Sequence, residues 1–340
     1  MSGNFWNQKN VFITGINGFV GGNLAKALLD AGANVFGLVK TIDQRSYLYY
    51  TSLNKKVVLI NGNITNKTLL NTFFSENDIH ICYHLASQVE VGVAIKYPFS
   101  TWETNIRGTY TLFEAIRESA ENVSAIVVAS SDKAYGEYPQ DKLPYQEHYP
   151  LNPRYTYDTS KACADLIARS YSSELFNMPV IITRFSNIYG PGQLNFSAII
   201  PDAIQCALGY DEFVPRSDGK NIRDFLFVED VANLYVTIAE SLYNNNNLKG
   251  EVFNAGTNDG KTVRYVIEKI YTQLNNEKAL KKILDLFDKN SNPMGEINNQ
   301  VMHYKKVKNY FGWEPLTEFD YGLDVTIEWF AKYIKNIGSK

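Results

Sequence analysis

The sequence is poor in the residues from which disulfides and metal sites are built. Only 3 cysteines and 4 histidines occur among 340 residues. Cys82, Cys163 and Cys206 are odd in number, widely spaced and set among apolar residues, which favours buried thiols over disulfides. The histidines, at positions 80, 84, 148 and 303, lack the spacing of metal ligands. We therefore expect neither a disulfide scaffold nor a bound metal.

Long apolar runs and blocks of one charge are also missing. No stretch approaches the about 18 uninterrupted apolar residues of a membrane-spanning helix. The start, MSGNFWNQKN, lacks the basic-then-apolar pattern of a secretory signal. The net charge is only −3, which gives no attraction to nucleic acid or to a membrane surface. We expect a cytoplasmic protein with no nucleic-acid or membrane partner.

The first half of the chain alternates short apolar runs with amphipathic stretches. Strands are expected at Val11–Thr14, Val35–Val39, Val57–Ile60, Ile79–Leu85, Ala125–Ala129 and Val180–Thr183, and helices at Phe19–Ala31, Thr104–Ser119 and 157–176. This alternation indicates a parallel sheet covered on both faces. We predict an α/β fold with a doubly wound parallel sheet of the Rossmann type in residues 1–185, to which 221–240 return. A smaller, mostly C-terminal α/β domain is expected in 186–340.

A glycine-rich turn follows the first expected strand. Gly15, Gly18 and Gly21 lie three apart in GINGFVGG and open a helix. Glycine allows the backbone to approach a pyrophosphate, and the helix N-terminus offers free N–H groups and positive dipole charge. The turn therefore predicts a dinucleotide site. Asn17, Phe19 and Val20 belong to the same candidate loop.

The sequence leaves the choice between NAD and NADP open. The second expected strand runs out at Lys40, where an acid usually holds the ribose 2′-hydroxyl. Lys40 favours a 2′-phosphate and Arg45 would assist, whereas Asp43 argues the other way, and all three also fit a solvated loop. After the third strand, Asn63 and Ile64 are expected to flank the adenine, with Asn63 offering an acceptor to its amino group.

Tyr157 and Lys161, in YDTSK, lie one helical turn apart. A nearby ammonium favours the phenolate, so such a tyrosine can act as a base near neutral pH. Two other pairs have this spacing, Tyr138/Lys142 and Tyr304/Lys308. The first crosses a proline in a loop and the second lies in a basic surface run. Only Tyr157/Lys161 leads into an apolar-faced helix that can pack beside a sheet.

Polar residues follow the expected strand Ala125–Ala129. Ligands of open parallel sheets bind beyond the carboxyl ends of the strands. Ser131, Asp132 and Lys133 are therefore expected to face the same site as Tyr157. The alternative is a surface turn with a local ion pair, which would contribute little to stability.

Taken together, these motifs resemble the extended short-chain dehydrogenase/reductase family. The resemblance rests on GINGFVGG, HLAS at 84–87, SSDKAYG at 130–136, YDTSK, RFSNIYGPG at 184–192, NIRDFLFVEDVA at 221–232 and FGWEPLTEFDYGLDVTIEWF at 311–330. It covers nearly the whole chain. It implies that 1–185 hold a tightly bound NAD or NADP, recycled within each turnover, and that 186–340 mainly bind a nucleotide sugar.

The residues after Ser131 indicate the branch of the family. In 4-epimerases they are usually small and uncharged, whereas in 4,6-dehydratases they are an acid and a base, as Asp132 and Lys133 are here. Lysine after aspartate resembles the CDP-glucose 4,6-dehydratase group, although it also occurs in dehydratases of UDP-N-acetylglucosamine that invert C5. Against CDP-glucose, NIRDFLFVED is the generic family form. A 4-epimerase, a C4 oxidase and, more remotely, a non-catalytic dinucleotide sensor stay as alternatives.

The resemblance also assigns roles. Tyr157, supported by Lys161, would remove the proton of the sugar 4-hydroxyl, with Ser131 bonded to the same oxygen. Lys133 would remove the C5 proton, and Asp132 would protonate the departing 6-hydroxyl. Further cofactor contacts are implied at Leu85, Ala86, Ser87 and Asn105, and substrate contacts at Gln88, Glu90, Asn187 and Arg223. The helices at 100–118 and 157–175 are expected to form the four-helix interface of a homodimer.

Overall fold

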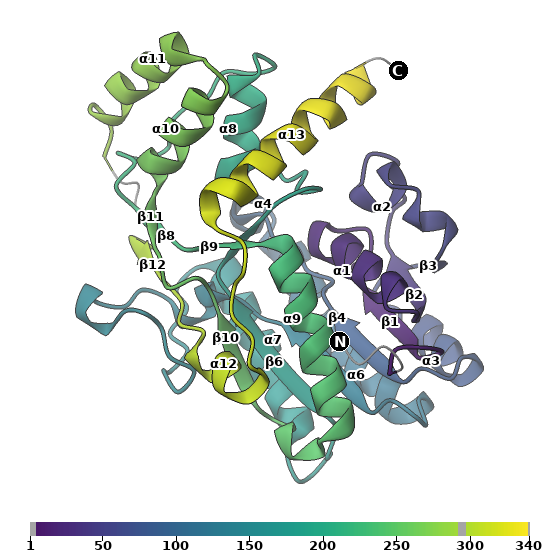
Figure 1. Ribbon diagram of the computed structural model, residues 1–340. Helices are drawn as coiled ribbons and strands as arrows, with labels where there is room; N and C mark the ends of the chain where they lie inside the picture. The colour runs from purple at the N-terminus through teal and green to yellow at the C-terminus, as the bar shows by residue number, and fades with distance from the viewer. Residues whose placement is uncertain (1–4, 292–296, 339–340) are drawn as a thin grey trace.

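The computed structural model describes residues 5–291 and 297–338. At its centre lies a seven-stranded sheet in the order β3-β2-β1-β4-β5-β6-β10, in which all neighbours are parallel (Figure 1). The strands are β1 (Asn10–Thr14), β2 (Asn34–Val39), β3 (Val58–Asn61), β4 (Ile81–His84), β5 (Ala125–Ala129), β6 (Val180–Phe185) and β10 (Val252–Ala255). The order reverses between β1 and β4, where doubly wound sheets bind their ligands. The prediction of a doubly wound parallel sheet is confirmed.

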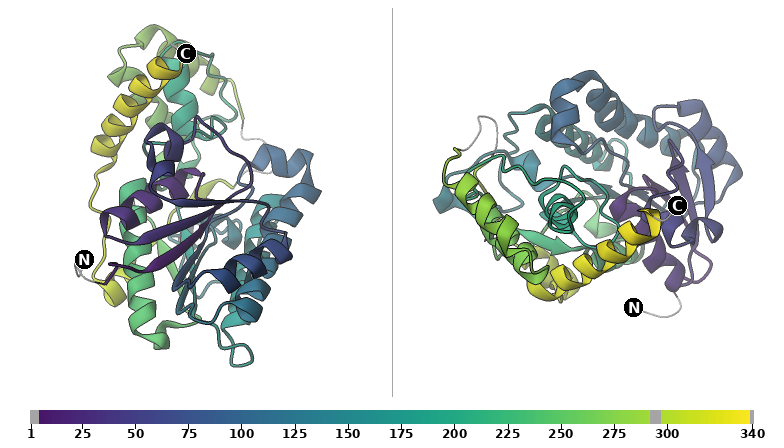
Figure 2. Two further views of the ribbon diagram at one scale, coloured as in Figure 1. Left: turned by 90° about the vertical axis from the view of Figure 1, so that its right-hand side faces the viewer. Right: turned by 90° about the horizontal axis from the view of Figure 1, so that it is seen from above.

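Helices cover both faces of this sheet (Figure 2, left). On one face α1 (Phe19–Asp30) and α9 (Val228–Asn244) pack against side chains such as Val11 and Ile13. On the other face α3 (Lys67–Glu76), α6 (Gly108–Ser119) and α7 (Thr156–Ser172) pack against Phe12 and its neighbours. Successive residues of a strand point to opposite faces, so burial of both faces explains the unbroken apolar runs in the sequence.

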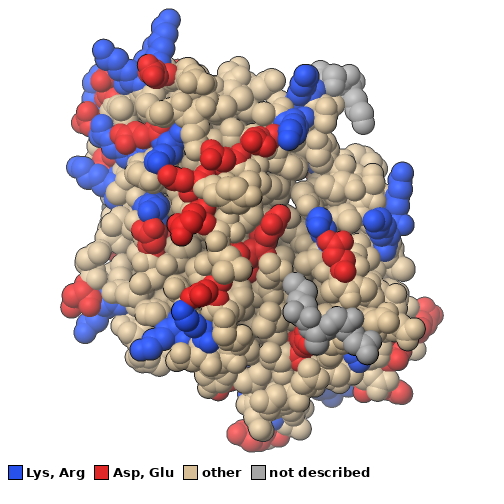
Figure 3. Space-filling view, viewed as in Figure 1, with Lys and Arg blue, Asp and Glu red and all other residues tan. Residues whose placement is uncertain are grey.

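The C-terminal helices enclose a core of their own at the carboxyl end of the sheet (Figure 1). They are α8 (Ile199–Ala207), α10 (Val263–Gln273), α11 (Glu277–Phe287) and α13 (Phe319–Gly338). Their outer surface carries interleaved acidic and basic side chains (Figure 3). On α10, Arg264 pairs with Glu268 and Asp288. Two small sheets join this part to the main sheet: β11 (Lys261–Thr262), β8 (Ile222–Arg223) and β12 (Asn299–Gln300), and β7 (Asn187–Tyr189) with β9 (Phe225–Phe227).

The chain crosses between the two parts more often than the sequence indicated. Of the expected return segment 221–240, β8 and β9 lie in the small sheets, whereas α9 packs on the main sheet. The strand β10 and the helices α8, α10 and α11 were not among the expected elements. The remaining helical segments are α2 (Tyr47–Tyr50), α4 (Val91–Lys96), α5 (Pro98–Trp102), α12 (Lys305–Phe311), a π-helical turn at Glu103–Arg107 and short 3-10 turns at Leu53–Lys55, Asp132–Tyr135, Gln140–Lys142 and Asn246–Leu248. Among the helices so described, none is long and apolar enough to cross a membrane.

Candidate active site at the carboxyl edge of the sheet

The turn after β1 has the form that a dinucleotide site needs. Gly15 has φ +75°, a conformation that glycine adopts readily, and a Cβ there would lie 2.9 Å from the backbone of Ala86. A Cβ on Gly21 would lie 2.3 Å from the carbonyl oxygen of Gly15. Gly18 caps α1 without a side chain, which leaves the first N–H groups of the helix to an anion. Asn17 lies in the same turn, Phe19 and Val20 begin α1, and all three are partly exposed.

The loops after β2 and β3 carry the residues expected around the adenosine. Lys40 is exposed, and Asp43 forms an exposed ion pair with Arg45, with Oδ1 and Nε 3.1 Å apart. Ile64 is buried against the α3 and α6 face of the sheet. The Asn63 side chain is exposed, and its Oδ1 accepts a hydrogen bond from the N–H two residues on, at 3.1 Å. Since an amide oxygen has two lone pairs, one is left for an adenine amino group.

Buried polar side chains hold the backbone of the loop after β4 in place. Thr14 Oγ1 accepts hydrogen bonds from the N–H groups of Leu85 at 3.2 Å and Ala86 at 3.1 Å. The same hydroxyl lies 2.9 Å from His84 Nδ1, and His84 Nε2 lies 2.9 Å from Thr109 Oγ1. Burial lowers the pKa of His84 to about 3, so the ring is neutral. Sequence reasoning assigned no role to His84, although this residue begins the HLAS motif.

Asn105 lies in the π-helical turn and ties this loop to α7. Its Oδ1 accepts from Gln88 N at 2.7 Å and from Ser87 Oγ at 3.0 Å. Its Nδ2 donates to Ser160 Oγ at 2.8 Å. Gln88 in turn donates from Nε2 to the carbonyl oxygen of Glu90 at 3.0 Å. The structure thus makes Asn105 a buried brace beneath the expected cofactor and substrate loops, at the kind of π-turn that is frequent at functional sites.

The turn after β5 gathers the expected acid and base. Ser131 Oγ donates to Asp132 Oδ1 at 3.0 Å and accepts from Lys133 N at 3.2 Å. Gln300, on β12, donates from Nε2 to Asp132 Oδ2 at 3.2 Å and accepts from Lys133 Nζ at 3.4 Å. Burial raises the pKa of Asp132, although the charge of Lys133 and the Ser131 hydrogen bond oppose the rise. Gln300, which the sequence did not indicate, therefore braces both groups.

Tyr157 and Lys161 approach this turn from α7. Lys161 Nζ donates to the carbonyl oxygen of Ala129, the last residue of β5, at 2.5 Å. Burial lowers the pKa of Lys161 to about 8. Burial also raises the pKa of Tyr157, and the charge of Asp132 adds to the rise, whereas the hydrogen bond with Ser131 opposes it. The pair predicted from spacing thus lies against the end of β5, beside the acid and the base.

Asp158, next to Tyr157 in YDTSK, is a further buried carboxyl of the site. It is 4% exposed and lines a cavity of about 500 Å³ together with Gly136, Asn152 and Tyr155. Burial raises its pKa to about 6, with the charge of Lys133 acting in the opposite sense. Sequence reasoning gave it no role, because an acid in the first turn of a helix is also an ordinary stabiliser of the helix dipole.

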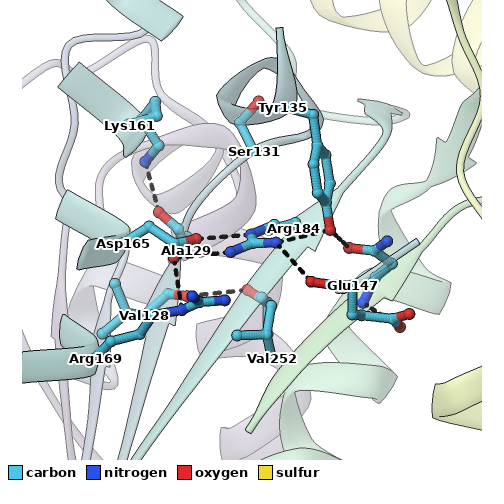
Figure 4. Close-up of polar contacts among 12 residues, drawn as sticks. Val128, Ala129, Ser131, Tyr135, Glu147, Lys161, Asp165, Arg169, Arg184 and Val252 are labelled. Carbon is cyan, nitrogen blue, oxygen red and sulfur yellow. Dashed lines mark hydrogen bonds and ion pairs between the residues drawn. The ribbon is translucent and has the colours of Figure 1, made fainter. Parts of the chain in front are cut away.

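A buried ion pair holds the turn after β5 against α7 (Figure 4). Arg184, on β6, donates to both oxygens of Asp165, at 2.8 and 2.9 Å, and to Tyr135 Oη at 2.8 Å. Tyr135 ends the turn that carries the acid and base, and it donates to Asn254 on β10 at 2.8 Å. Asp165 lies one helical turn after Lys161 on α7. The network therefore fixes the two halves of the site relative to each other.

The two expected phosphate ligands come from the small sheets. Asn187 Nδ2 donates to the carbonyl oxygen of Asp224 at 3.3 Å. Arg223 is 7% exposed, and its Nη1 donates to the carbonyl oxygens of residues 222 and 298, both at 2.9 Å. It lies close enough to Asp132 to favour the charged carboxylate and so lower its pKa. Arg223 pairs in register with Gln300, so both reach the site from one sheet.

Two curated proteins and a solved structure match this chain over nearly its whole length. The chain is 29% identical over 336 residues to a low-salt glycan biosynthesis protein of Haloferax volcanii, covering 94% of this chain and 98% of that one. It is 27% identical over 348 residues to CDP-glucose 4,6-dehydratase of Salmonella typhimurium, covering 98% and 93%. The crystal structure of dTDP-glucose 4,6-dehydratase from Bacillus anthracis in complex with NAD superimposes with a TM-score of 0.81 at 28% identity, covering 95% and 97%.

The fold, the glycine turn and the Tyr157/Lys161 pair beside β5 define an extended short-chain dehydrogenase/reductase. The family model described as GDP-mannose 4,6 dehydratase matches residues 12–326. The chain therefore belongs to the extended short-chain dehydrogenase/reductase family, within the nucleotide-sugar 4,6-dehydratase branch.

Proposed function

We propose that this chain is a nucleotide-sugar 4,6-dehydratase, which converts an NDP-hexose to the NDP-4-keto-6-deoxyhexose with bound NAD. The observation that carries the proposal is the buried acid, Asp132, held next to the base Lys133 by Gln300 and next to Tyr157 by Ser131. Oxidation at C4 needs only a base and a cofactor. An added acid and base are what the loss of water from C5 and C6 requires.

The residues of the site divide the reaction between them. Tyr157 receives the proton of the 4-hydroxyl, while Ser131 holds the same oxygen. Bound NAD supplies the hydride chemistry, oxidising C4 and later reducing C6. Because the 4-ketone acidifies C5–H, Lys133 can take that proton, and protonated Asp132 gives its own to the departing 6-hydroxyl. Burial raises the pKa of Asp132 and so favours the protonated form that this step needs.

The cofactor and substrate are proposed on the chemistry of the loops and on the relatives. The glycine turn and the N-terminus of α1 would hold the diphosphate of NAD. The Bacillus anthracis complex favours NAD. Lys40 is exposed to solvent, so it does not by itself require the 2′-phosphate of NADP. Asn187 and Arg223 would hold the substrate diphosphate, with Gln88 and Glu90 nearer the sugar. The Asp132-Lys133 pair and the Salmonella typhimurium relative favour CDP-glucose.

The test is incubation in heavy water with CDP-glucose, GDP-mannose, dTDP-glucose and UDP-N-acetylglucosamine. A dehydratase gives a product with deuterium at C5 and without the 6-oxygen, whereas a 4-epimerase or C4 oxidase keeps that oxygen. Retention of the 6-oxygen with every substrate that reacts would overturn the proposal. Lys133→Ala should form no deoxy product, and Lys142→Ala is its matched control, because Lys142 is an exposed lysine in the loop that follows.

We also propose that the enzyme is a homodimer formed through the helices at 98–119 and α7. These helices leave large apolar side chains in solvent: Phe99 is 74% exposed and Leu166 is 55% exposed. Tyr110, on α6, is 43% exposed. A two-fold contact of such a face on itself would bury all of them in both copies. Leu166→Glu should yield a monomer in analytical ultracentrifugation, and an unchanged sedimentation coefficient would contradict the interface.

A further inference from the structure

His84, the last residue of β4, is a buried titratable side chain that the proposed reaction does not use. It is 4% exposed, and each of its ring nitrogens faces a threonine hydroxyl. Nδ1 lies 2.9 Å from Thr14 Oγ1, in register on the neighbouring strand β1, and Nε2 lies 2.9 Å from Thr109 Oγ1, on α6. The ring therefore bridges the sheet and a covering helix, and its protonation depends on what the two hydroxyls can donate and accept.

The other hydrogen bonds of the two threonines determine which ring nitrogen carries the proton. Thr109 Oγ1 donates its only proton to the carbonyl oxygen of Asn105 at 2.6 Å, so it can only accept from His84, and Nε2 is protonated. Thr14 Oγ1 uses both lone pairs on two N–H groups of the loop after β4, at 3.2 and 3.1 Å, so it can only donate to Nδ1. His84 is therefore the neutral Nε2–H tautomer, in agreement with the low pKa that burial gives it.

The hydrogen bonds continue from Asn105 to the backbone of the proposed base. Asn105 Nδ2 donates to Ser160 Oγ at 2.8 Å, and Ser160 Oγ donates to the carbonyl oxygen of Tyr157 at 2.7 Å. On its other side, Asn105 Oδ1 accepts from Ser87 Oγ at 3.0 Å and from Gln88 N at 2.7 Å. One side chain thus joins the end of the loop after β4 to the first turn of α7.

The side chains that carry these bonds are buried and come from five different elements. We call them the His84 frame: Thr14 on β1, His84 on β4, Asn105 in the π-helical turn, Thr109 on α6 and Ser160 on α7. Each of them is at most 4% exposed. Water therefore cannot replace a partner that is lost, and an unpaired polar group in the frame is costly. A change at His84 should consequently reach both the loop after β4 and α7.

We propose that His84 is a positioning residue that holds the loop 85–88 and the proposed base Tyr157 in one fixed relation. The inference rests on the proposed function, in which this loop contacts NAD and Tyr157 takes the proton of the 4-hydroxyl. Oxidation at C4 requires the cofactor and the base to meet at one carbon and its oxygen. An error in their relative position therefore lowers the rate even when cofactor and substrate are both bound.

The first test observes the ring directly in the wild-type protein with bound NAD. In nitrogen-15 NMR, assigned through its own backbone amide, His84 should show an unprotonated Nδ1 and a protonated Nε2 from about pH 5 to 8. Titration of this ring in that range, or a proton on Nδ1, would overturn the frame. This measurement decides the question even if a variant at His84 fails to fold.

Two substitutions separate the two ends of the frame. An asparagine Oδ1 can replace Nδ1, so His84→Asn keeps the acceptor for Thr14 and loses the donor to Thr109, whereas the Nε2 of His84→Gln does the reverse. His84→Asn should bind NAD within about 3-fold of the wild type and oxidise C4 about 10-fold more slowly at saturating NAD. His84→Gln should bind NAD about 10-fold more weakly and oxidise C4 within about 3-fold of the wild-type rate at saturation. Titration calorimetry measures the affinity, and stopped-flow absorbance of the reduced cofactor measures the oxidation.

Further variants control for the substitution and for the route of the effect. His148→Asn is the matched control, because His148 is exposed, and it should change neither quantity. If His84 acts on Tyr157 through Asn105 and Ser160, His84→Asn combined with Ser160→Ala should slow C4 oxidation no more than the slower single variant. Additive slowing, or equal losses of affinity and rate in His84→Asn and His84→Gln, would overturn the frame. A wild-type enzyme that reduces its cofactor but keeps the 6-oxygen would overturn the dehydratase proposal and leave the frame intact.

Discussion

The turn after β5 and the small sheet β11-β8-β12 meet at one carboxyl group but reach it differently. The turn brings Ser131 and Lys133 to Asp132 because they are neighbours in sequence. The small sheet brings Gln300 from 168 residues away. In the proposed mechanism the turn carries the groups that react, and the sheet carries a group that only holds them. A short sequence motif therefore supplies the proposed reacting groups, whereas their arrangement depends on how the turn packs against the small sheet.

Removal of a reactive group from the turn should have the largest effect. Lys133→Ala deletes the proposed base for C5, so formation of the deoxy sugar should fall by about 1,000-fold. Oxidation at C4 depends on Tyr157 and Ser131, so reduced cofactor should still accumulate, which near-ultraviolet absorbance measures beside product mass spectrometry. Dehydration at the normal rate in this variant would mean that another residue is the base for C5.

Removal of the brace from the small sheet should have a smaller effect of a different kind. Gln300→Leu keeps the volume but takes the hydrogen bonds from Asp132 Oδ2 and Lys133 Nζ. Loss of alignment should lower kcat by about 10- to 100-fold with little change in KM. Steady-state kinetics measure both constants. Arg223, in register on the next strand, offers a contrast, because Arg223→Lys should raise KM if it holds the diphosphate.

The same contrast explains how far the sequence could lead. The strands of the main sheet were predictable because each is a short apolar run bounded by turn residues, and β10 was missed because Val252–Ala255 follows a polar stretch outside the alternating pattern. Tyr157 and Lys161 were predictable from helical spacing and from the family motifs. Gln300 carries no local signal, since its contacts with Asp132 and Lys133 exist only once β12 has packed beside β8.

Asp158 contrasts with Asp132. Ser131 and Gln300 hold the Asp132 carboxyl by hydrogen bonds, whereas the Asp158 carboxyl lines a cavity. Its folded-state pKa of about 6 lies above its ordinary 3.8, so the folded protein binds this proton more tightly than the unfolded chain. The stability that results is present below pH 3.8 and is lost as the pH rises to 6. Asp158→Asn should therefore raise the free energy of unfolding at pH 7 by about 2 kcal/mol and change it little at pH 4.

Urea denaturation at the two pH values measures this difference. Asp141→Asn, in the exposed turn Gln140–Lys142, is the matched control for the same substitution at the surface. An Asp158→Asn variant that is equally stabilised at both pH values would contradict the assignment of the raised pKa to this carboxyl.

The smallest effect is expected at a tyrosine and lysine that have the Tyr-x-x-x-Lys spacing but belong neither to α7 nor to the turn after β5. Tyr304 and Lys308 repeat the Tyr-x-x-x-Lys spacing at α12, where Lys308 forms an ion pair with Glu314. Tyr304→Phe should leave the rate of dehydration unchanged and alter the free energy of unfolding by less than about 0.5 kcal/mol. A substantial loss of activity would mean that Tyr157 is the wrong tyrosine. An unchanged rate in Tyr304→Phe, beside an inactive Tyr157→Phe, would mean that this spacing yields a catalytic base only where the tyrosine and lysine pack against the end of β5.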